Sequence, residues 1–268
     1  FMKINKQIHR DGQEATKIFD NRSLKMDYRT LEPILEKGMV VLDVGCGTGS
    51  ISKDIANAIG QSGNVIGIDT SKNFIESGKE SYKAIQNLEL IHCDLFEFQT
   101  SQKFDLITAA RTLQWLSNPK EALLKMKSLL KPNGKISILD YNHTTIEWNP
   151  EPPTSMKNFY KTFLKWRRDA GMNNAIADTL PNLMKETGLV DIEKINSDEH
   201  YEKYRTDFKS KVGIWSNVAG SKQMVEDGYL DDDLRLKAIE DYNNWVKHQA
   251  ISMTMKLNEV RGTLPAVL

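Results

Sequence analysis

The sequence has few cysteines, no excess of either charge and few histidines. Its two cysteines, Cys46 and Cys93, make neither a disulfide framework nor a zinc site, so we expect reduced thiols. Lys plus Arg and Asp plus Glu number 36 each, and this balance offers no basic excess for a nucleic-acid partner. The five histidines form no helical i, i+4 pair, and no metal is expected.

Long apolar segments are also missing. No run approaches the roughly 18 apolar residues needed to cross a bilayer. The N-terminal residues carry no apolar stretch of the kind found in signal peptides. The hydrophobic share of 40% is nevertheless enough for a proper core. These features predict a cytoplasmic protein without a membrane span.

The most informative stretch joins an apolar run to three glycines. Val40–Val44 is followed by Gly45, Gly47 and Gly49, and a helical pattern then runs over Ile51–Ile59. This order predicts a buried strand, a tight loop and a helix start, whose first N–H groups lack partners and carry partial positive charge. Glycine lets the backbone approach a ligand that a Cβ would push away. The stretch is either a ligand site or only a tight strand–helix turn.

The glycine spacing narrows the choice of ligand. The dinucleotide fingerprint is G-x-G-x-x-G, and Ser50 stands where that pattern has its third glycine. No lysine follows, so the loop is not a Walker-type phosphate loop. Asp43, two residues before the first glycine, would repel a phosphate and suits a cation.

The stretch Val40–Ser50 closely resembles motif I of the class I S-adenosylmethionine-dependent methyltransferases. In that family the loop borders the methionine part of the cofactor, which carries an ammonium and a sulfonium. The resemblance implies S-adenosylmethionine as cofactor and S-adenosylhomocysteine as product. The cofactor-binding residues that it implies in this stretch are Asp43, Gly45, Cys46, Gly47 and Gly49.

A second acid ends the next predicted strand, Asn64–Asp69. Asp69 lies 24 positions after Gly45, where a carboxylate can accept hydrogen bonds from both ribose hydroxyls. Thr70 follows and is also assigned to the cofactor site, and Ser71 is expected to cap the next helix, over residues 72–85. The alternative is that Asp69 only caps the start of the next helix and binds no ligand.

A third acid ends the predicted strand Leu88–Asp94. The resemblance implies that Asp94 and Leu95 form the adenine corner. There the acid accepts a hydrogen bond from the adenine amino group, and the next backbone N–H meets a ring nitrogen. Leu95 or Phe96 would lie against the base. A strand-end turn without a ligand is the alternative.

The fourth predicted strand, Phe104–Ala110, ends in small residues that would leave room for the methionine arm of the cofactor. The resemblance implies that Ala110, Arg111 and Gln114 lie at the cofactor. Trp115 matches an aromatic position that the family carries just before the next helix.

Residues 118–140 carry clear local signals. Asn118 and Pro119 predict a helix start, with Asn as the cap and Pro in the first turn. Lys131–Gly134 predicts the end of that helix, and Lys135–Asp140 predicts the fifth strand. Strand–helix alternation up to this point predicts an α/β fold with a doubly wound, mostly parallel sheet. The ligand crevice should lie at the carboxyl ends of its strands.

Beyond residue 140 the alternation stops. We expect a loop over Tyr141–Pro153, a helix ending near Gly171, and further helices over 178–188, about 205–219 and 231–248. Strands are expected over Val190–Ile195 and Ile251–Val260. Toward the N-terminus, helices are expected over His9–Lys25 and 28–37.

The methyltransferase fold, as the resemblance implies it, has seven strands with a final antiparallel hairpin strand and a helical lid. We expect one domain over 1–268. Its core is predicted over about 28–140, 174–203 and 250–262, and the lid over about 141–173 and 204–249.

The reaction that the resemblance implies is an in-line displacement of methyl from the sulfonium sulfur by a nucleophile of the acceptor. Alignment contributes up to about 7–11 kcal/mol in intramolecular models, and the leaving group is a neutral thioether, so a catalytic base is not required. The Asn/Asp-Pro-Pro-aromatic motif of DNA-type enzymes is missing after the fourth strand, where Thr108–Arg111 stands. The layout resembles bacterial small-molecule and quinone-type methyltransferases, and it predicts a small organic methyl acceptor.

Aromatic residues supply the expected acceptor contacts, and one histidine is a candidate base. The expected contacts are Tyr28, Trp115, Tyr141, Trp148 and Trp166. His143 could act as general base for a hydroxyl acceptor, or it could be a surface-loop histidine. Arg167 and Arg168 are expected on a solvated helix face.

Two functions of different classes stay open. The first is a small-molecule methyltransferase, which the motifs favour. The second is a non-catalytic sensor or partner subunit that binds S-adenosylmethionine or S-adenosylhomocysteine. A third, aminopropyl transfer, would need acids after the fourth strand to hold an amine, and these are missing. No pattern specifies the methylated atom or an oligomeric state.

Overall fold

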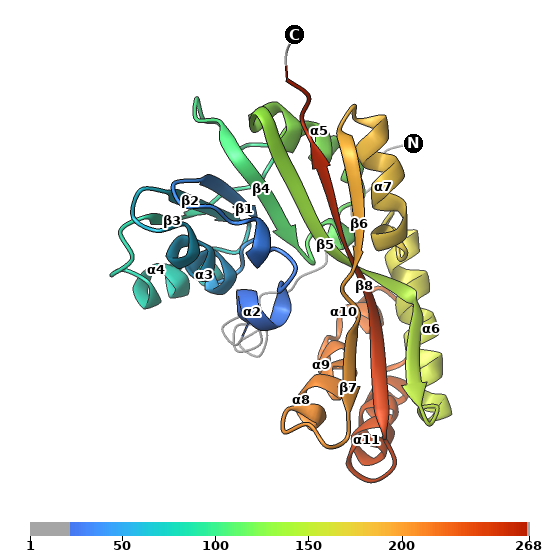
Figure 1. Cartoon of the computed structure of the whole chain (residues 1–268). Helices are drawn as coiled ribbons and strands as arrows, with labels where there is room; N and C mark the ends of the chain where they lie inside the picture. The colour runs from blue at the N-terminus through green and yellow to red at the C-terminus, as the bar shows by residue number, and fades with distance from the viewer. Residues whose placement is uncertain (1–21, 267–268) are drawn as a thin grey trace. The chain divides into compact units, whose positions relative to one another are not determined.

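The computed structural model describes residues 22–266, and the chain divides into two compact units (Figure 1). The core unit comprises residues 22–140, 176–197 and 258–266. The insert unit comprises residues 141–175 and 198–257. The insert ranges lie close to those expected for the lid, and the organisation as one domain stays a prediction.

The core unit is built on a mostly parallel sheet with the strand order β3-β2-β1-β4-β5-β8-β6. Pairs from β3 through β5 are parallel, and β6 pairs antiparallel with the end of β8. β1 and β2 are buried along nearly their whole length, which explains why they are continuously apolar rather than alternating. The strands are β1 (Val40–Val44), β2 (Asn64–Asp69), β3 (Leu88–His92), β4 (Phe104–Ala110), β5 (Leu130–Asn149), β6 (Val190–Asn196) and β8 (Ser252–Thr263).

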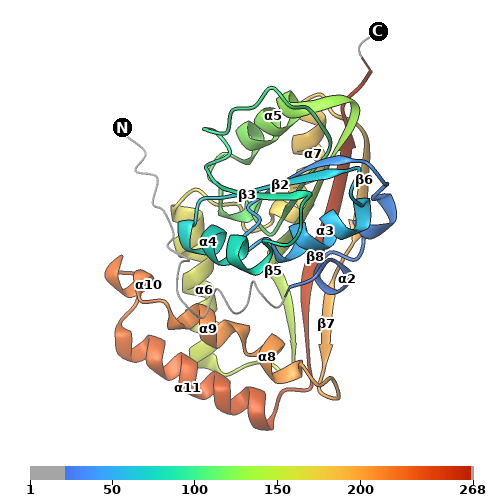
Figure 2. The same ribbon diagram turned by 90° about the vertical axis from the view of Figure 1, so that its left-hand side faces the viewer.

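Helices cover both faces of this sheet (Figure 2). Apolar stripes of α5 and α7 pack on one face, where Met126 and Leu180 are fully buried in one cluster with Leu42 and Ile107. α3 and α4 lie on the opposite face (Figure 2). The helical elements of the core unit are α2 (Leu24–Asp27), η1 (Glu32–Ile34), α3 (Ser50–Ile59), α4 (Lys72–Ser81), η2 (Leu113–Trp115), α5 (Pro119–Leu129) and α7 (Ile176–Glu186).

The helix starts follow the sequence signals closely. Ser71 caps α4, and its Oγ accepts the N–H of Phe74 at 3.4 Å. Pro119 opens α5 with Asn118 in the cap position, although the Asn118 side chain makes no capping hydrogen bond. α5 ends at Leu129, as the Lys-Pro-Asn-Gly sequence after it predicts.

The fifth strand differs from the prediction. Residues 141–149 were expected in a loop, and this was wrong, because β5 continues to Asn149. Tyr, Thr, Ile and Trp residues in this stretch favour extended structure. The prolines that suggested a loop, Pro150, Pro152 and Pro153, all follow the end of the strand. The sheet also has an eighth strand, β7 (Glu199–Glu202), which pairs antiparallel with β8.

The insert unit packs helices around an aromatic core. Trp215 is buried, with ring centroids 4.7 Å from Tyr160 and 5.9 Å from Phe163. The helix expected over about 205–219 is two short helices, α8 and α9, which meet at Gly213. The helices are α6 (Thr154–Asp169), α8 (Phe208–Val212), α9 (Ile214–Gly220), α10 (Gln223–Glu226) and α11 (Asp232–His248).

One arginine of α6 was placed wrongly. Arg168 is exposed as expected, but Arg167 is fully buried. Its Nε donates to Asn174 Oδ1 at 2.9 Å, and its guanidinium lies 5.4 Å from the Phe163 ring centroid, one helical turn earlier. The aromatic neighbour and the amide offset the cost of burying the charge.

Near the N-terminus the structure is less helical than predicted. Most of the helix expected over His9–Lys25 falls outside the described residues, and α2 covers only its last part and two residues beyond. In place of the helix expected over 28–37 the chain forms the single turn η1, with Pro33 inside it. None of the described helices is long and apolar enough to cross a membrane.

Candidate functional site

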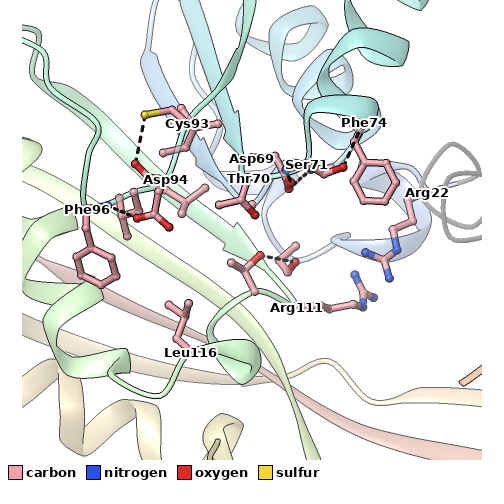
Figure 3. A pocket seen from close by; sticks show the side chains of 17 residues that line it. Arg22, Asp69, Thr70, Ser71, Phe74, Cys93, Asp94, Phe96, Arg111 and Leu116 are labelled. Carbon is pink, nitrogen blue, oxygen red and sulfur yellow. Dashed lines mark hydrogen bonds between the residues drawn. The ribbon is translucent and has the colours of Figure 1, made fainter. Parts of the chain in front are cut away.

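A pocket lies at the carboxyl ends of β1, β2, β3 and β4 in the core unit (Figure 3). Eight of the twelve predicted cofactor residues line it: Gly45, Gly47, Asp69, Thr70, Asp94, Leu95, Ala110 and Arg111. The other four, Asp43, Cys46, Gly49 and Gln114, are not among the lining residues. Phe96, which was expected against the base, also lines the pocket. The lining residues that the sequence did not suggest are Arg22, Val44, Ile68, Ser71, Phe74, Cys93, Thr112 and Leu116.

The glycine loop after β1 is held against both neighbouring strands. Gly45 N–H donates to Ile68 O at 2.8 Å, which ties the loop to β2. Gly45 has φ 71°, and a Cβ there would lie 2.3 Å from Thr112 Oγ1, just after β4. Gly47 has φ 58°. Only glycine combines this conformation with so close an approach, and Gly45 and Gly47 line the pocket.

Asp69 ends β2 with its carboxylate already oriented by the backbone. Oδ2 accepts the N–H of Gly47 at 2.9 Å, and Oδ1 accepts the N–H of Ser71 at 2.8 Å. A carboxylate offers about four acceptor positions, so two remain for a diol in the pocket. The cap of α4 is Ser71 rather than Asp69. The geometry therefore suits the predicted ribose contact better than a helix-start role.

The corner after β3 combines an acid with apolar surface. Asp94 Oδ1 accepts the N–H of Phe96 at 2.8 Å, and the Asp94 carbonyl accepts the N–H of Phe98 at 2.9 Å. This turn presents Leu95, which is buried, and Phe96, whose side chain is 47% exposed. Such a corner can hold a flat base between apolar side chains while the acid faces its polar edge.

The turn after β4 places a buried arginine at the pocket. Arg111 adopts φ 57°, an uncommon conformation for a residue with a side chain. Its N–H donates to Leu139 O at 2.6 Å, and its Nη2 donates to the carbonyl of Asp27 at 3.0 Å. Gln114 does not line the pocket: its Nε2 donates to Arg111 O at 3.1 Å, so it braces this turn.

Asp43 is not part of the pocket wall, although Val44 and Gly45, which follow it, are. It is 3% exposed, and Ser52 Oγ donates to its Oδ2 at 2.5 Å. Burial raises the pKa of Asp43 from 3.8 to about 6, the Ser52 hydrogen bond opposes the rise, and the charge of Asp69 adds to it. A cation placed above the glycine loop would favour the ionised form.

Replacing Asp43 with asparagine should change how stability depends on pH. Because the pKa is raised on folding, the stabilising contribution of Asp43 is fully present below about pH 3.8 and is lost as the pH rises through about 6. At pH 7.5 Asp43→Asn, which buries no charge, should be more stable by up to about 3 kcal/mol. Urea titrations of both proteins between pH 4.5 and 7.5 should show the difference shrinking toward acid. A difference that does not vary with pH contradicts the raised pKa.

Tyr28 and Trp115 are the two predicted acceptor contacts in the core unit. Tyr28 is buried, its hydroxyl lies 2.7 Å from Ser137 Oγ, and Ser137 Oγ donates to Glu259 at 2.6 Å. Burial raises the pKa of Tyr28, so its hydroxyl stays protonated. This network joins α2 to the sheet, which gives Tyr28 a structural role. Trp115 is half-buried in η2.

The remaining predicted acceptor residues, together with the candidate base, lie in the insert unit. Tyr141, His143 and Trp148 belong to one aromatic cluster. The ring centroids of Tyr141 and His143 are 5.2 Å apart, and those of Trp148 and Trp215 are 6.5 Å apart. His143 is 6% exposed, so the alternative of a surface-loop histidine was wrong. Burial, with a smaller effect of Arg167, lowers the pKa of His143 well below its ordinary value and keeps the imidazole neutral.

Two indole N–H groups of the insert unit have side-chain acceptors. Trp148 Nε1 donates to the Tyr242 hydroxyl at 3.2 Å, and Trp166 Nε1 donates to Asp227 Oδ2 at 2.7 Å. Trp166 is 3% exposed. Trp166 therefore packs as part of the core of this unit, whereas Trp148 keeps part of its surface exposed.

Comparison with known proteins identifies the family. A family described as a methyltransferase domain matches residues 35–223. The chain belongs to the class I S-adenosylmethionine-dependent methyltransferases. The methyl donor of this methyltransferase is S-adenosylmethionine.

Similar proteins support the same family. A demethylmenaquinone methyltransferase of Staphylococcus aureus strain MRSA252 is 33% identical over 54% of this chain and 64% of its own length. The protein of the same description from strain JH9 is 28% identical over 71% of this methyltransferase and 88% of its own length. In structure, Haemonchus contortus phosphoethanolamine N-methyltransferase 2 in complex with S-adenosyl-L-methionine matches with a TM-score of 0.57 at 17% identity. That match covers 90% of this chain and 52% of the other, and it supports the fold.

Proposed function

We propose that this methyltransferase transfers a methyl group from S-adenosylmethionine to a small organic acceptor, with the cofactor bound in the pocket of the core unit. The observation that carries the proposal is the order of chemical groups along one sheet edge. The adenine corner follows β3, the ribose acid Asp69 ends β2, the glycine loop follows β1 and Arg111 follows β4. These four strands are neighbours in the order β3-β2-β1-β4.

The strand order predicts the course of an extended ligand. Adjacent strands lie about 4.8 Å apart, so three steps from β3 to β4 give roughly 14 Å, close to the length of an adenosyl-methionine. Base, ribose and amino-acid portion then meet Asp94, Asp69 and the glycine loop in turn. A dinucleotide would instead bring a phosphate to the loop, beside the carboxylate of Asp43, which disfavours it.

The residues of the core unit hold and align the donor. When bound, S-adenosylmethionine supplies an electrophilic methyl group on a sulfonium whose departure leaves a neutral thioether. Asp69 and Asp94 fix the adenosine portion, and the small Ala110 leaves space beside the glycine loop. Alignment of donor and acceptor is the main contribution of such a site, and it can lower the activation barrier by up to about 7–11 kcal/mol.

The acceptor in this proposal is a small organic molecule, and a quinol-type ring is the first class to test. Relatives named for demethylmenaquinone support that choice. The insert unit carries a cluster of aromatic side chains, a residue class that packs well against a ring. The lowered pKa of His143 makes its imidazole a weak base, so the proposed transfer does not depend on proton removal by His143. The proposal further places the protein in the cytoplasm without a nucleic-acid partner, supported by two free cysteines and a net charge of zero.

Binding and transfer can be tested separately. Isothermal titration should show binding of S-adenosylmethionine and S-adenosylhomocysteine, and no binding of NAD. Incubation with methyl-labelled S-adenosylmethionine and a panel of small acceptors, a demethylated menaquinol analogue included, should then yield a labelled organic product. Binding of NAD alone would show that the glycine loop was misassigned. Tight binding of the donor with no transfer to any acceptor, including a small-molecule cell extract, would favour the non-catalytic sensor.

A further inference from the structure

Two exposed apolar side chains lie in neighbouring turns at one end of the insert unit. Tyr204, in the turn after β7, is 85% exposed, and Ile251, in the turn before β8, is 49% exposed. The N–H of Lys203 donates to the carbonyl of Ile251 at 2.9 Å, which joins the two turns. The end of β7, α8, the end of α11 and the start of β8 gather at this end of the unit (Figure 1 and Figure 2). We call residues 203–211 and 247–251 the tip.

Exposed lysines accompany the two apolar side chains. Lys203 precedes Tyr204, and Lys209 lies in the short helix α8 that follows. Lys247 is in the last turn of α11, four residues before Ile251. α8 packs against both β7 and α11, so the three lysines belong to the same end of the unit.

The tip has a local surplus of positive charge, although the net charge of the whole chain is zero. Asp207 is its only acid, and its Oδ2 lies 2.8 Å from Arg205 Nη2. Glu202, the residue just before the tip, is bonded to His200, with 2.7 Å between Oε1 and Nε2. The lysines are therefore left to attract a further negatively charged partner.

The two ends of α11 differ in charge. The helix begins after Asp231 with two further acids, Asp232 and Asp233, and it ends with Lys247 and His248. The acidic end also exposes a leucine, Leu234. Exposed apolar surface thus occurs at both ends of this helix, and only the tip combines it with positive charge.

The size of the apolar area favours a membrane over a protein as the partner. A stable protein interface buries about 800 Å² on each side, more than two side chains can supply. A bilayer surface requires less, because a few apolar side chains enter the headgroup region while lysines are attracted to anionic lipid. Tyrosine suits such a position, since its ring is apolar and its hydroxyl can stay hydrated.

We propose that the tip docks on a membrane surface that contains anionic lipid, with Tyr204 and Ile251 among the headgroups and the three lysines against the lipid phosphates. This docking goes beyond the proposed methyl transfer and does not depend on which acceptor the enzyme uses. The acidic end of α11 is repelled from the same surface. The charges therefore determine which end of the insert unit faces the membrane.

The test is sedimentation of the full chain with sucrose-loaded phosphatidylcholine vesicles, with and without about 30% phosphatidylglycerol. At low salt the wild type should partition onto the anionic vesicles about 10-fold or more better than onto the neutral ones. Raising NaCl to about 1 M should release most of the bound protein, because the Debye length then falls to about 3 Å.

Variants separate the apolar contribution from the charge. Tyr204→Ser combined with Ile251→Ser should lower partition onto anionic vesicles by about 10-fold or more. Replacing the three lysines with glutamine should lower it by about 10- to 100-fold at low salt. Leu234→Ser is the matched control, because it removes an exposed leucine of the same unit at the acidic end of α11, and it should bind as wild type.

The proposed function is measured independently in the same proteins. All the replaced side chains are exposed and lie outside the cofactor pocket, so melting temperature and S-adenosylhomocysteine binding should match the wild type. Wild type that stays in solution with anionic vesicles at low salt overturns the docking, as does sedimentation that the tip variants leave unchanged. A dimer without lipid, seen by analytical ultracentrifugation and dissociated by the tip variants, would instead make the tip an interface between copies of this chain and would also overturn the docking.

Discussion

Replacing Asp69 with alanine should weaken the binding of S-adenosylmethionine and S-adenosylhomocysteine by about 1.5–3 kcal/mol, the scale of hydrogen bonds to a charged group. The affinity would then fall by roughly 10- to 150-fold. Asp69 has this effect because two backbone N–H groups, of Gly47 and Ser71, already hold its carboxylate in place. Because the Asp69 side chain is already ordered, ligand binding does not incur the entropy cost of fixing it. Isothermal titration measures the loss directly.

A cycle of variants separates the ribose contact from an effect on the loop. The wild type should bind a 2′-deoxy ligand more weakly than the parent ligand in the same titration. Asp69→Ala should show a smaller difference between the two ligands. Glu76→Ala, which removes an exposed acid from α4, is the control for loss of charge. If Asp69→Ala binds S-adenosylhomocysteine as tightly as wild type, Asp69 does not hold the ribose.

The second large effect is expected from Gly78→Ala in α4. A Cβ at Gly78 would lie 2.1 Å from the carbonyl oxygen of Thr48 and 2.7 Å from Leu90 Cδ1. Alanine favours a helix over glycine by about 1 kcal/mol. Contact with a backbone oxygen outweighs this gain, since that oxygen cannot rotate away. We expect a net loss of about 3 kcal/mol or more in the free energy of unfolding.

This loss should lower the melting temperature by roughly 6–12 °C. It should also weaken cofactor binding, because Thr48 belongs to the glycine loop that α4 would push away. Gly220→Ala is the matched control: Gly220 ends α9, and a Cβ there would meet nothing within 4 Å. Scanning calorimetry of the two variants gives the comparison. Melting at the wild-type temperature for Gly78→Ala would mean that α4 can shift at little cost.

Much of the core unit could be predicted because its signals are local. The buried runs of β1 and β2, the glycines after β1 and the acid that ends β2 are all read within a few residues. Parallel strands bring these ends to one edge, so the positions of Gly45, Asp69 and Asp94 in one pocket followed from topology. The cap at Ser71 and the start of α5 at Pro119 rest on equally local rules.

The residues that were missed depend on contacts between distant parts of the chain. Arg22 reaches the pocket because Ser50 holds its carbonyl, 28 residues away in sequence, and no local pattern announces such a bond. Arg167 looked like a surface charge, yet Phe163 and Asn174 surround it in the fold. His143 was assigned to a loop because three prolines nearby outweighed the strand-forming residues next to it. Contacts between distant parts of the chain therefore decide the positions of Arg22 and Arg167, whereas at His143 two local signals competed and the strand-forming one prevailed.

The position of β8 in the chain bears on the order in which the protein can fold as it is synthesised. The end of β8, Asn258–Thr263, supplies the partner strand for β6, and it follows every residue of the insert unit. It also brings Glu259 to Ser137, and Arg261, which forms an ion pair with Glu259 on the same strand, to the carbonyl of Thr30. In the nascent chain, β6 therefore lacks its partner, the end of β8, until more than fifty further residues have left the ribosome. An unpaired strand edge in that interval makes the growing chain a candidate for chaperone binding.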